Sequence, residues 1–64
     1  MIQAVVKFDK ERVMVFDEKG EQMPEFQGKY EETRVKILAH APKGTRFFHG
    51  LWDVPGNAVA RKDW

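Results

Sequence analysis

The chain of 64 residues contains neither cysteine nor serine, and these two absences limit its chemistry. Without cysteine it has no disulfides to reinforce a small fold and no thiolate ligands for a metal. The usual hydroxyl and thiol nucleophiles reduce to Thr33 and Thr45, and neither has a convincing base beside it in the sequence. We therefore predict that the protein is not an enzyme and that it uses no cofactor.

Long apolar runs and a charge excess of one sign are also missing. No stretch approaches the roughly 18 apolar residues of a membrane span, and the N-terminal segment lacks the basic lead and apolar run of a signal peptide. Eleven Lys and Arg against ten Asp and Glu leave a formal net charge of +1, with both signs scattered along the chain. Nucleic-acid binders more often show a clustered basic face. These features predict a soluble, cytoplasmic protein without a membrane partner.

No residues have the spacing of a metal motif. His40, His49 and Asp53 are the side chains that could form a zinc or acid–base site. His49 and Asp53 are four positions apart, which is roughly 13 Å along an extended strand, so their side chains would meet only if the chain turned. We expect ordinary solvated polar residues here, and no metal.

The hydrophobic content is sufficient for one small domain over residues 1–64. Hydrophobic residues make up 42% of the chain, and the aromatic ones comprise five Phe, two Trp and one Tyr. Each large ring buries about 150–250 Å², which matters because so short a chain buries only about 60% of its unfolded surface. Self-association is a further support that folds of this size use.

The N-terminal part has the pattern of a β-hairpin. Apolar residues alternate with more polar ones over residues 2–8, and the polar segment 9–12 allows the chain to reverse. The apolar β-branched and aromatic run at 13–16 favours a second strand, which we expect to be covered on both faces. A short third strand at 21–23 would end at Pro24, which cannot donate to a strand ladder.

The segment 29–41 fits a helix better than a strand, and this choice decides the fold. Acidic residues in its first turn and basic residues near its end suit the helix dipole, and Pro42 and Gly44 supply stop signals. As a strand, its alternation is broken at Leu38. The apolar face of the helix would consist of Tyr30, Ile37, Leu38 and Ala41.

We predict an α+β fold with a small antiparallel sheet and one helix packed on it, in the order ββ(β)αβ. The sheet would consist of the N-terminal hairpin, or a three-stranded meander, together with an aromatic strand at 45–52. The alternative, if 29–41 is extended, is a small all-β barrel of the SH3-like type. The sequence VPGN at 54–57 predicts a type II turn. Residues 58–62 fit either a last short strand against 51–53 or one helical turn capped by Asn57.

The stretch TRFFHGLW at 45–52 is the main candidate for a binding surface. In a strand, alternate side chains face opposite sides, and we expect Phe47 and Leu51 to face the core. The other side would then carry Arg46, Phe48 and Trp52. Rings beside an arginine are typical of protein interfaces and of platforms that stack unpaired bases. Alternatively, both sides of the strand are buried and the rings belong to the core.

Trp64, the last residue of the sequence, either docks back on the domain or fills a partner's pocket. We favour docking, because intramolecular closure costs less entropy than association.

We therefore predict a small non-enzymatic protein-interaction or regulatory module that binds a protein partner or a second copy of itself, as in a homodimer. The candidate binding residues are Arg46, Phe48, Trp52, Trp64, Arg61 and Lys62. The alternative is a single-stranded nucleic-acid-binding module that uses the same rings together with Lys43 and the other basic residues. Its affinity would fall steeply with salt.

Overall fold

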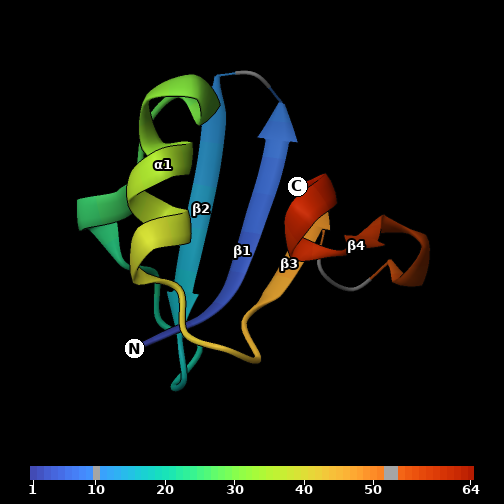
Figure 1. Cartoon of the computed structure of the whole chain (residues 1–64), viewed down its shortest axis with the longest axis horizontal. Coiled ribbons are helices and arrows are strands. Elements are labelled where there is room, and N and C mark those ends of the chain that lie inside the picture. The colour runs from blue at the N-terminus through green and yellow to red at the C-terminus, as the bar shows by residue number, and fades with distance from the viewer. Residues whose placement is uncertain (10, 52–53) are drawn as a thin grey trace.

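The computed structural model describes residues 1–9, 11–51 and 54–64. In these residues the chain forms one α-helix and a four-stranded mixed sheet, which confirms the predicted α+β fold and not the all-β barrel. The strands are β1 (Ile2–Asp9), β2 (Arg12–Asp17), β3 (Arg46–His49) and β4 (Ala58–Val59), and the helix is α1 (Tyr30–His40). Three short 3₁₀ turns complete the described elements: η1 (Pro24–Phe26), η2 (Pro55–Asn57) and η3 (Arg61–Asp63). The strand order is β2-β1-β3-β4 (Figure 1).

Strands β1 and β2 form the predicted antiparallel hairpin, in which Val5 lies opposite Val15. The Asp9 carboxylate accepts a hydrogen bond of 2.8 Å from the backbone N–H of Glu11, as Asp commonly does where a chain reverses. The third strand expected at 21–23 is reduced to a single bridge between Phe16 and Gln22, because Pro24 starts the 3₁₀ turn η1 instead.

Strand β3 pairs with β1 in parallel, so the prediction of an antiparallel sheet is wrong at this position. Parallel neighbours need a crossover connection, which is usually a helix. Here α1 runs back along the sheet, and the short loop 41–45 then leads the chain into β3 in the direction of β1 (Figure 1).

Of the two structures that the sequence left open for residues 58–62, the short strand is the one that forms. Strand β4 pairs antiparallel with Phe47 and Phe48, while residues 52 and 53 of the partner segment expected for it lie outside the described residues. The 3₁₀ turn η3 follows at 61–63 with Ala60 at its N-cap position, so it is not the turn expected to be capped by Asn57. The type II turn predicted at 54–57 is wrong. Gly56 is absent from the residues with positive φ, and the chain forms the 3₁₀ turn η2 there.

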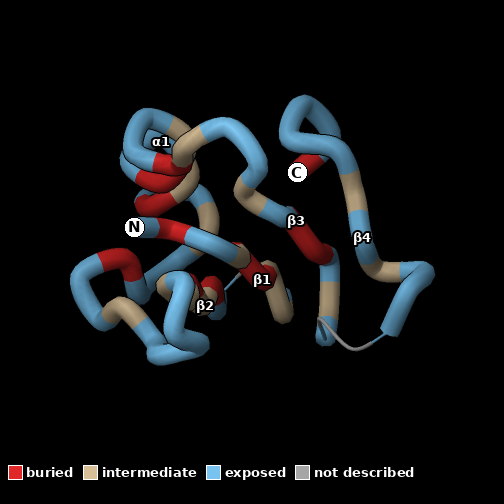
Figure 2. The backbone as a smooth tube through the Cα atoms, turned by 90° about the horizontal axis from the view of Figure 1, so that it is seen from below, coloured by how far each residue is buried: buried red, intermediate tan, exposed pale blue. Residues whose placement is uncertain are grey.

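The main core lies between the sheet and a layer formed by α1 and the C-terminal residue (Figures 1 and 2). Ile37 is fully buried on the predicted apolar face of α1, while Tyr30 and Leu38 are half-buried against the core. Thr33 is also buried, although its polarity hid it from the sequence pattern, and its hydroxyl donates to the Lys29 carbonyl 2.9 Å away. The core cluster comprises Ile2, Val5, Val13, Val15, Phe26, Ile37, Ala41, Phe47 and Trp64.

The opposite face of the sheet carries a second row of buried apolar side chains. Val6 pairs with Met14 on β2 and with Phe48 on β3, and Val6 and Phe48 are buried although neither belongs to the main core cluster. Strand β3 is therefore buried on both faces, through Phe47 on one side and Phe48 on the other.

Candidate functional site

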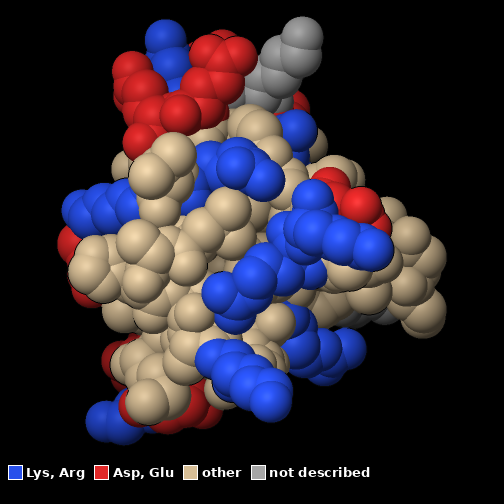
Figure 3. All heavy atoms as spheres, in the orientation of Figure 1, with Lys and Arg blue, Asp and Glu red and all other residues tan. Residues whose placement is uncertain are grey.

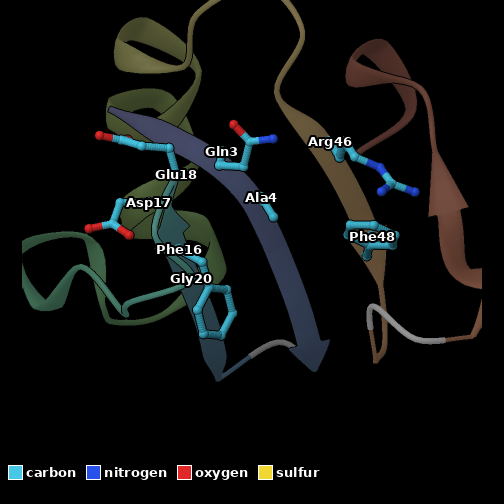
Figure 4. Close-up of a pocket in the computed structure, with 8 residues that line it drawn as sticks. All are labelled: Gln3, Ala4, Phe16, Asp17, Glu18, Gly20, Arg46 and Phe48. Atoms are coloured by element: carbon cyan, nitrogen blue, oxygen red, sulfur yellow. The ribbon is translucent and has the colours of Figure 1, made fainter.

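A groove lies on the sheet face opposite α1, the face that carries the second row of buried apolar side chains (Figure 4). Ala4 on the central strand has Phe16 as its neighbour on β2 and Arg46 as its neighbour on β3. Directly paired residues project to the same face of a sheet, so these three side chains share it. The groove has a volume of about 310 Å³ and is lined by Gln3, Ala4, Phe16, Asp17, Glu18, Gly20, Arg46 and Phe48.

The β3 side of the groove combines an apolar ring with a cation. The Arg46 guanidinium lies 5.3 Å from the centre of the Phe48 ring, a cation–π arrangement that keeps the exposed cation above an apolar surface. Within the described part of the chain, Arg46 forms no ion pair. Its planar fork can therefore pair with a carboxylate from another molecule.

The β2 side of the groove is acidic. The Asp17 carboxylate accepts backbone hydrogen bonds of 2.9 Å from Glu21 and from Lys19, and these bonds hold its pKa below the usual range, with the Glu21 bond as the largest cause. Glu18 pairs with the Met1 ammonium at 3.1 Å, and its pKa is lowered by its own backbone N–H and then by this ammonium. The groove thus places negative charge on one side of an apolar floor and positive charge on the other.

The predicted binding residues do not form one surface. Arg46 and Phe48 both line the groove, but Phe48 is only 3% exposed, which agrees with the alternative that both sides of the strand are buried and not with an open face that carries its ring. Its ring is buried because its cross-strand neighbour Val6 and the Arg46 side chain cover it. Leu51, expected in the core, is instead 48% exposed. Trp52 lies outside the described residues.

Trp64 docks back on the domain, as predicted, and is therefore not an exposed binding residue. It is 2% exposed, and its indole Nε1 donates to the Phe48 carbonyl 3.1 Å away. Its ring lies 5.3 Å from that of Phe47 and 5.2 Å, edge-on, from that of Tyr30. Trp64 thus fills the space between α1 and β3 on the helix side of the sheet.

Arg61 and Lys62 are exposed on η3, away from the groove. The Arg61 guanidinium donates to the carbonyls of Ala41, at 3.1 Å, and Pro42, at 2.7 Å. It therefore fastens η3 to the loop after α1, and it lies over the Phe47 ring from the helix side.

The acidic side chains are concentrated in the first half of the chain and the basic ones in the second half, which the formal net charge of +1 does not show. Residues 1–32 carry five basic and eight acidic side chains, a formal charge of −3, and residues 33–64 carry six basic and two acidic, a charge of +4. In Figure 3 the basic side chains gather across the middle of the face formed by α1, the following loop and η3. Counting the charges in each half separately would have revealed this asymmetry from the sequence.

The histidines do not come together. His40 lies 5.8 Å from the Phe26 ring, whereas the Nε2 of His49 lies 3.5 Å from the Trp64 carbonyl oxygen, and Asp53 lies outside the described residues. Over residues 1–9, 11–51 and 54–64, no three or more His, Asp or Glu side chains are grouped to hold a metal ion. Within the same ranges, no helix has the length and apolar character required to cross a membrane.

Comparison with known proteins does not place the chain in a family: no protein-family model, no curated protein and no solved structure matches it.

Proposed function

We propose that the protein is a non-enzymatic interaction module that binds a segment of a partner protein in the groove on the open sheet face. The observation that carries this proposal is the apolar floor between the Asp17 and Glu18 carboxylates and the Arg46 guanidinium, which has no ion-pair partner among residues 1–9, 11–51 and 54–64. A matching segment carries an apolar side chain with an acidic residue on the Arg46 side and a basic residue on the other.

The dimensions of the groove define what it can hold. A volume of about 310 Å³ is at the lower end of ligand pockets, which suits one large apolar side chain or two small ones. Most of the specificity then comes from the charged rims, where a hydrogen bond to an ionised group contributes about 1.5–3 kcal/mol. Contacts of this size support a transient complex, as is common for small interfaces.

Selection from a random-peptide library tests the proposal even when the partner is unidentified. Peptides selected on the wild-type protein should share an apolar residue next to Asp or Glu. Selection on Arg46→Glu should lose this acidic preference, because the charge that meets it is reversed. Arg12→Glu is the matched control: Arg12 is exposed on β2, pairs with Asp9 and does not line the groove.

An unchanged consensus on Arg46→Glu, or no enrichment on the wild type, would contradict the proposal. Sedimentation velocity on the wild-type protein identifies the case in which the occupant is a second copy of the chain. Association weakened by Arg46→Glu and unaffected by Arg12→Glu would assign the groove to a homodimer.

A second candidate function, nucleic-acid binding, is favoured by the basic face of the C-terminal half. Arg61, Lys62 and Lys43 are exposed there and form no ion pair with described residues. The rings proposed for base stacking do not support it, since Phe48 and Trp64 are buried. Binding would therefore rest on phosphate contacts.

Titration of a labelled single-stranded oligonucleotide at low salt separates this candidate from the first. A phosphate-based interaction should weaken steeply with salt, with a log–log slope of about −0.7 per phosphate contacted. Lys62→Glu should reduce the affinity more than Lys19→Glu, because Lys19 lies in the turn after β2, in the acidic half of the chain. A flat titration would remove the candidate.

A further inference from the structure

The sheet face that holds the groove carries large and small side chains on alternate strands. Directly paired residues project to the same face, so the pairing of the four strands shows which side chains share it. The large ones, on β2 and β3, are Met14, Phe16, Arg46 and Phe48, and the smaller ones, on β1 and β4, are Ala4, Val6 and Ala58. Because the strand order is β2-β1-β3-β4, the face alternates between raised and low rows.

This alternation is complementary to itself. A second copy can be rotated by 180° about an axis that is parallel to the strands and lies between β1 and β3. In that arrangement β3 of each copy faces β1 of the other, β2 faces β4, and every large row meets a smaller one. Because Ala4 and Arg46 are direct neighbours in the sheet, the rotation places Arg46 of one copy over Ala4 of the other, in its groove.

The charges are complementary in the same arrangement. Figure 4 shows Asp17 and Glu18 on one side of β1 and Arg46 on the other. An Arg46 side chain that enters the groove of a second copy therefore reaches a site lined by two carboxylates. Its apolar stem can lie on the apolar floor while the guanidinium pairs with a carboxylate. Arg46 is exposed and has no ion-pair partner within residues 1–9, 11–51 and 54–64.

We propose that the occupant of the groove is a second copy of the chain, in a symmetric dimer in which Arg46 of each copy enters the groove of the other. The inference rests on the proposed interaction function and names its partner. A second copy is favoured because one face carries both halves of the match, the cation and the acidic groove, as an interface with twofold symmetry requires.

A twofold axis that crosses the strands at a right angle fits less well. It would place β2 over β2 and β3 over β3, so that large rows would meet large rows. An axis parallel to the strands also agrees with the usual packing of two sheets, whose strand directions stay within about 30° of each other.

The size of the face predicts a weak dimer. Strand β1 has eight residues, which is about 26 Å at 3.3 Å per residue, and neighbouring strands are about 4.8 Å apart. Since β3 and β4 are shorter, each copy would bury on the order of 400 Å², and the pair about 800 Å², the size of a transient contact. We therefore expect monomers and dimers to exchange at high micromolar concentration.

Sedimentation of the full chain from the low micromolar to the millimolar range is the test. The wild type should form dimers as the concentration rises. Arg46→Glu and Glu18→Arg should each weaken this association at least about tenfold, which corresponds to about 1.4 kcal/mol. Lys62→Glu is the matched control, because it makes the same charge change as Arg46→Glu on η3, away from the groove.

Mixing the two variants gives the decisive measurement. In an equimolar mixture of Arg46→Glu and Glu18→Arg, one groove keeps the native contact, and in the other the new carboxylate meets the new guanidinium. The mixture should therefore associate more tightly than either variant alone. Circular dichroism checks that both variants are folded, and both positions are exposed on the surface.

A steric variant tests the position of the axis without changing a charge. Ala58 is exposed on β4, which faces the large row of β2 in the proposed dimer, so Ala58→Trp should block association by overlap. Ala39→Trp is the matched control, since Ala39 is exposed on α1 and lies outside this face.

Three results would overturn the inference: a protein that stays monomeric into the millimolar range, association that survives Arg46→Glu or Ala58→Trp, or a mixture no tighter than its components. Peptide selection on the wild type distinguishes this failure from failure of the proposed function. A monomeric protein that enriches apolar peptides with an acidic residue keeps the groove as a binding site for another protein. A monomeric protein that enriches none loses both proposals.

Discussion

Replacing Trp64 by Ala should remove most of the stability of the domain. The side chain is 2% exposed, contacts the Phe47 and Tyr30 rings and donates to the Phe48 carbonyl. Loss of a buried Trp side chain typically costs about 3–5 kcal/mol. The variant also loses the hydrogen bond from the indole Nε1 to the Phe48 carbonyl, and an intramolecular hydrogen bond typically contributes about 0.5–1.5 kcal/mol.

This loss is large relative to the total. Native domains have about 0.05–0.15 kcal/mol of stability per residue, so a chain of 64 residues has roughly 3–10 kcal/mol. Trp64→Ala should therefore be largely unfolded or close to its midpoint at 25 °C. Trp64→Phe should be intermediate, because it keeps an aromatic ring in the core and loses the indole donor and part of the buried area.

Urea unfolding followed by far-ultraviolet circular dichroism measures these differences without relying on tryptophan fluorescence. Val35→Ala is the control, since Val35 is 74% exposed on α1 and its replacement should change stability by less than about 0.5 kcal/mol. A Trp64→Ala variant within about 1 kcal/mol of the wild type would refute the reasoning. Trp64 would then be an exchangeable surface residue.

Two further predictions concern the backbone and the acid limit of stability. Gly50→Ala should lower the thermal midpoint, because Gly50 has φ of +106° and an added Cβ would meet the Asn57 amide nitrogen at 2.6 Å. Gly56→Ala is the control and should have little effect, because a Cβ added at Gly56 meets nothing within 4 Å. Equal thermal midpoints for the two variants would contradict this prediction. Asp17 has a folded-state pKa below its ordinary value of 3.8, so its contribution to stability is present above that pH and is lost as pH falls through the folded pKa. Asp17→Asn should therefore show a shallower decline in its urea midpoint between about pH 5 and 2, and an unchanged decline would show that the Glu21 and Lys19 hydrogen bonds do not act in this way.

Local patterns predicted the hairpin and the helix because both depend on near neighbours. The alternation in residues 2–8 and the charge order in 29–41 correspond to β1 and α1 within a residue or so at each end. The parallel pairing of β1 with β3 could not be inferred in this way. It depends on the path of the chain through α1 and the short loop 41–45, and the residues of a strand do not encode which neighbour they will have.

The candidate site was only partly predictable for a related reason. Arg46 and Phe48 were identified as a pair on one side of a strand, and both line the groove. The strand pattern did not show that β3 lies inside the sheet, between β1 and β4, where its rings are covered on both faces. The groove joins residues of β1, β2 and β3, and β3 is distant in sequence from the other two strands, so no local motif marks it.

The central position of β1 has a consequence for biosynthesis. This strand leaves the ribosome before the other three strands, yet Ala4 pairs with Arg46, and the ring that closes the helix side of the core is that of Trp64. A nascent chain can form the hairpin early, but one edge of β1 stays unpaired until translation has passed β3, and the core stays open until Trp64 has emerged. Synthesis on the ribosome should therefore yield a native domain in one late step, and a chain released before Trp64 should be a substrate for chaperones or proteases.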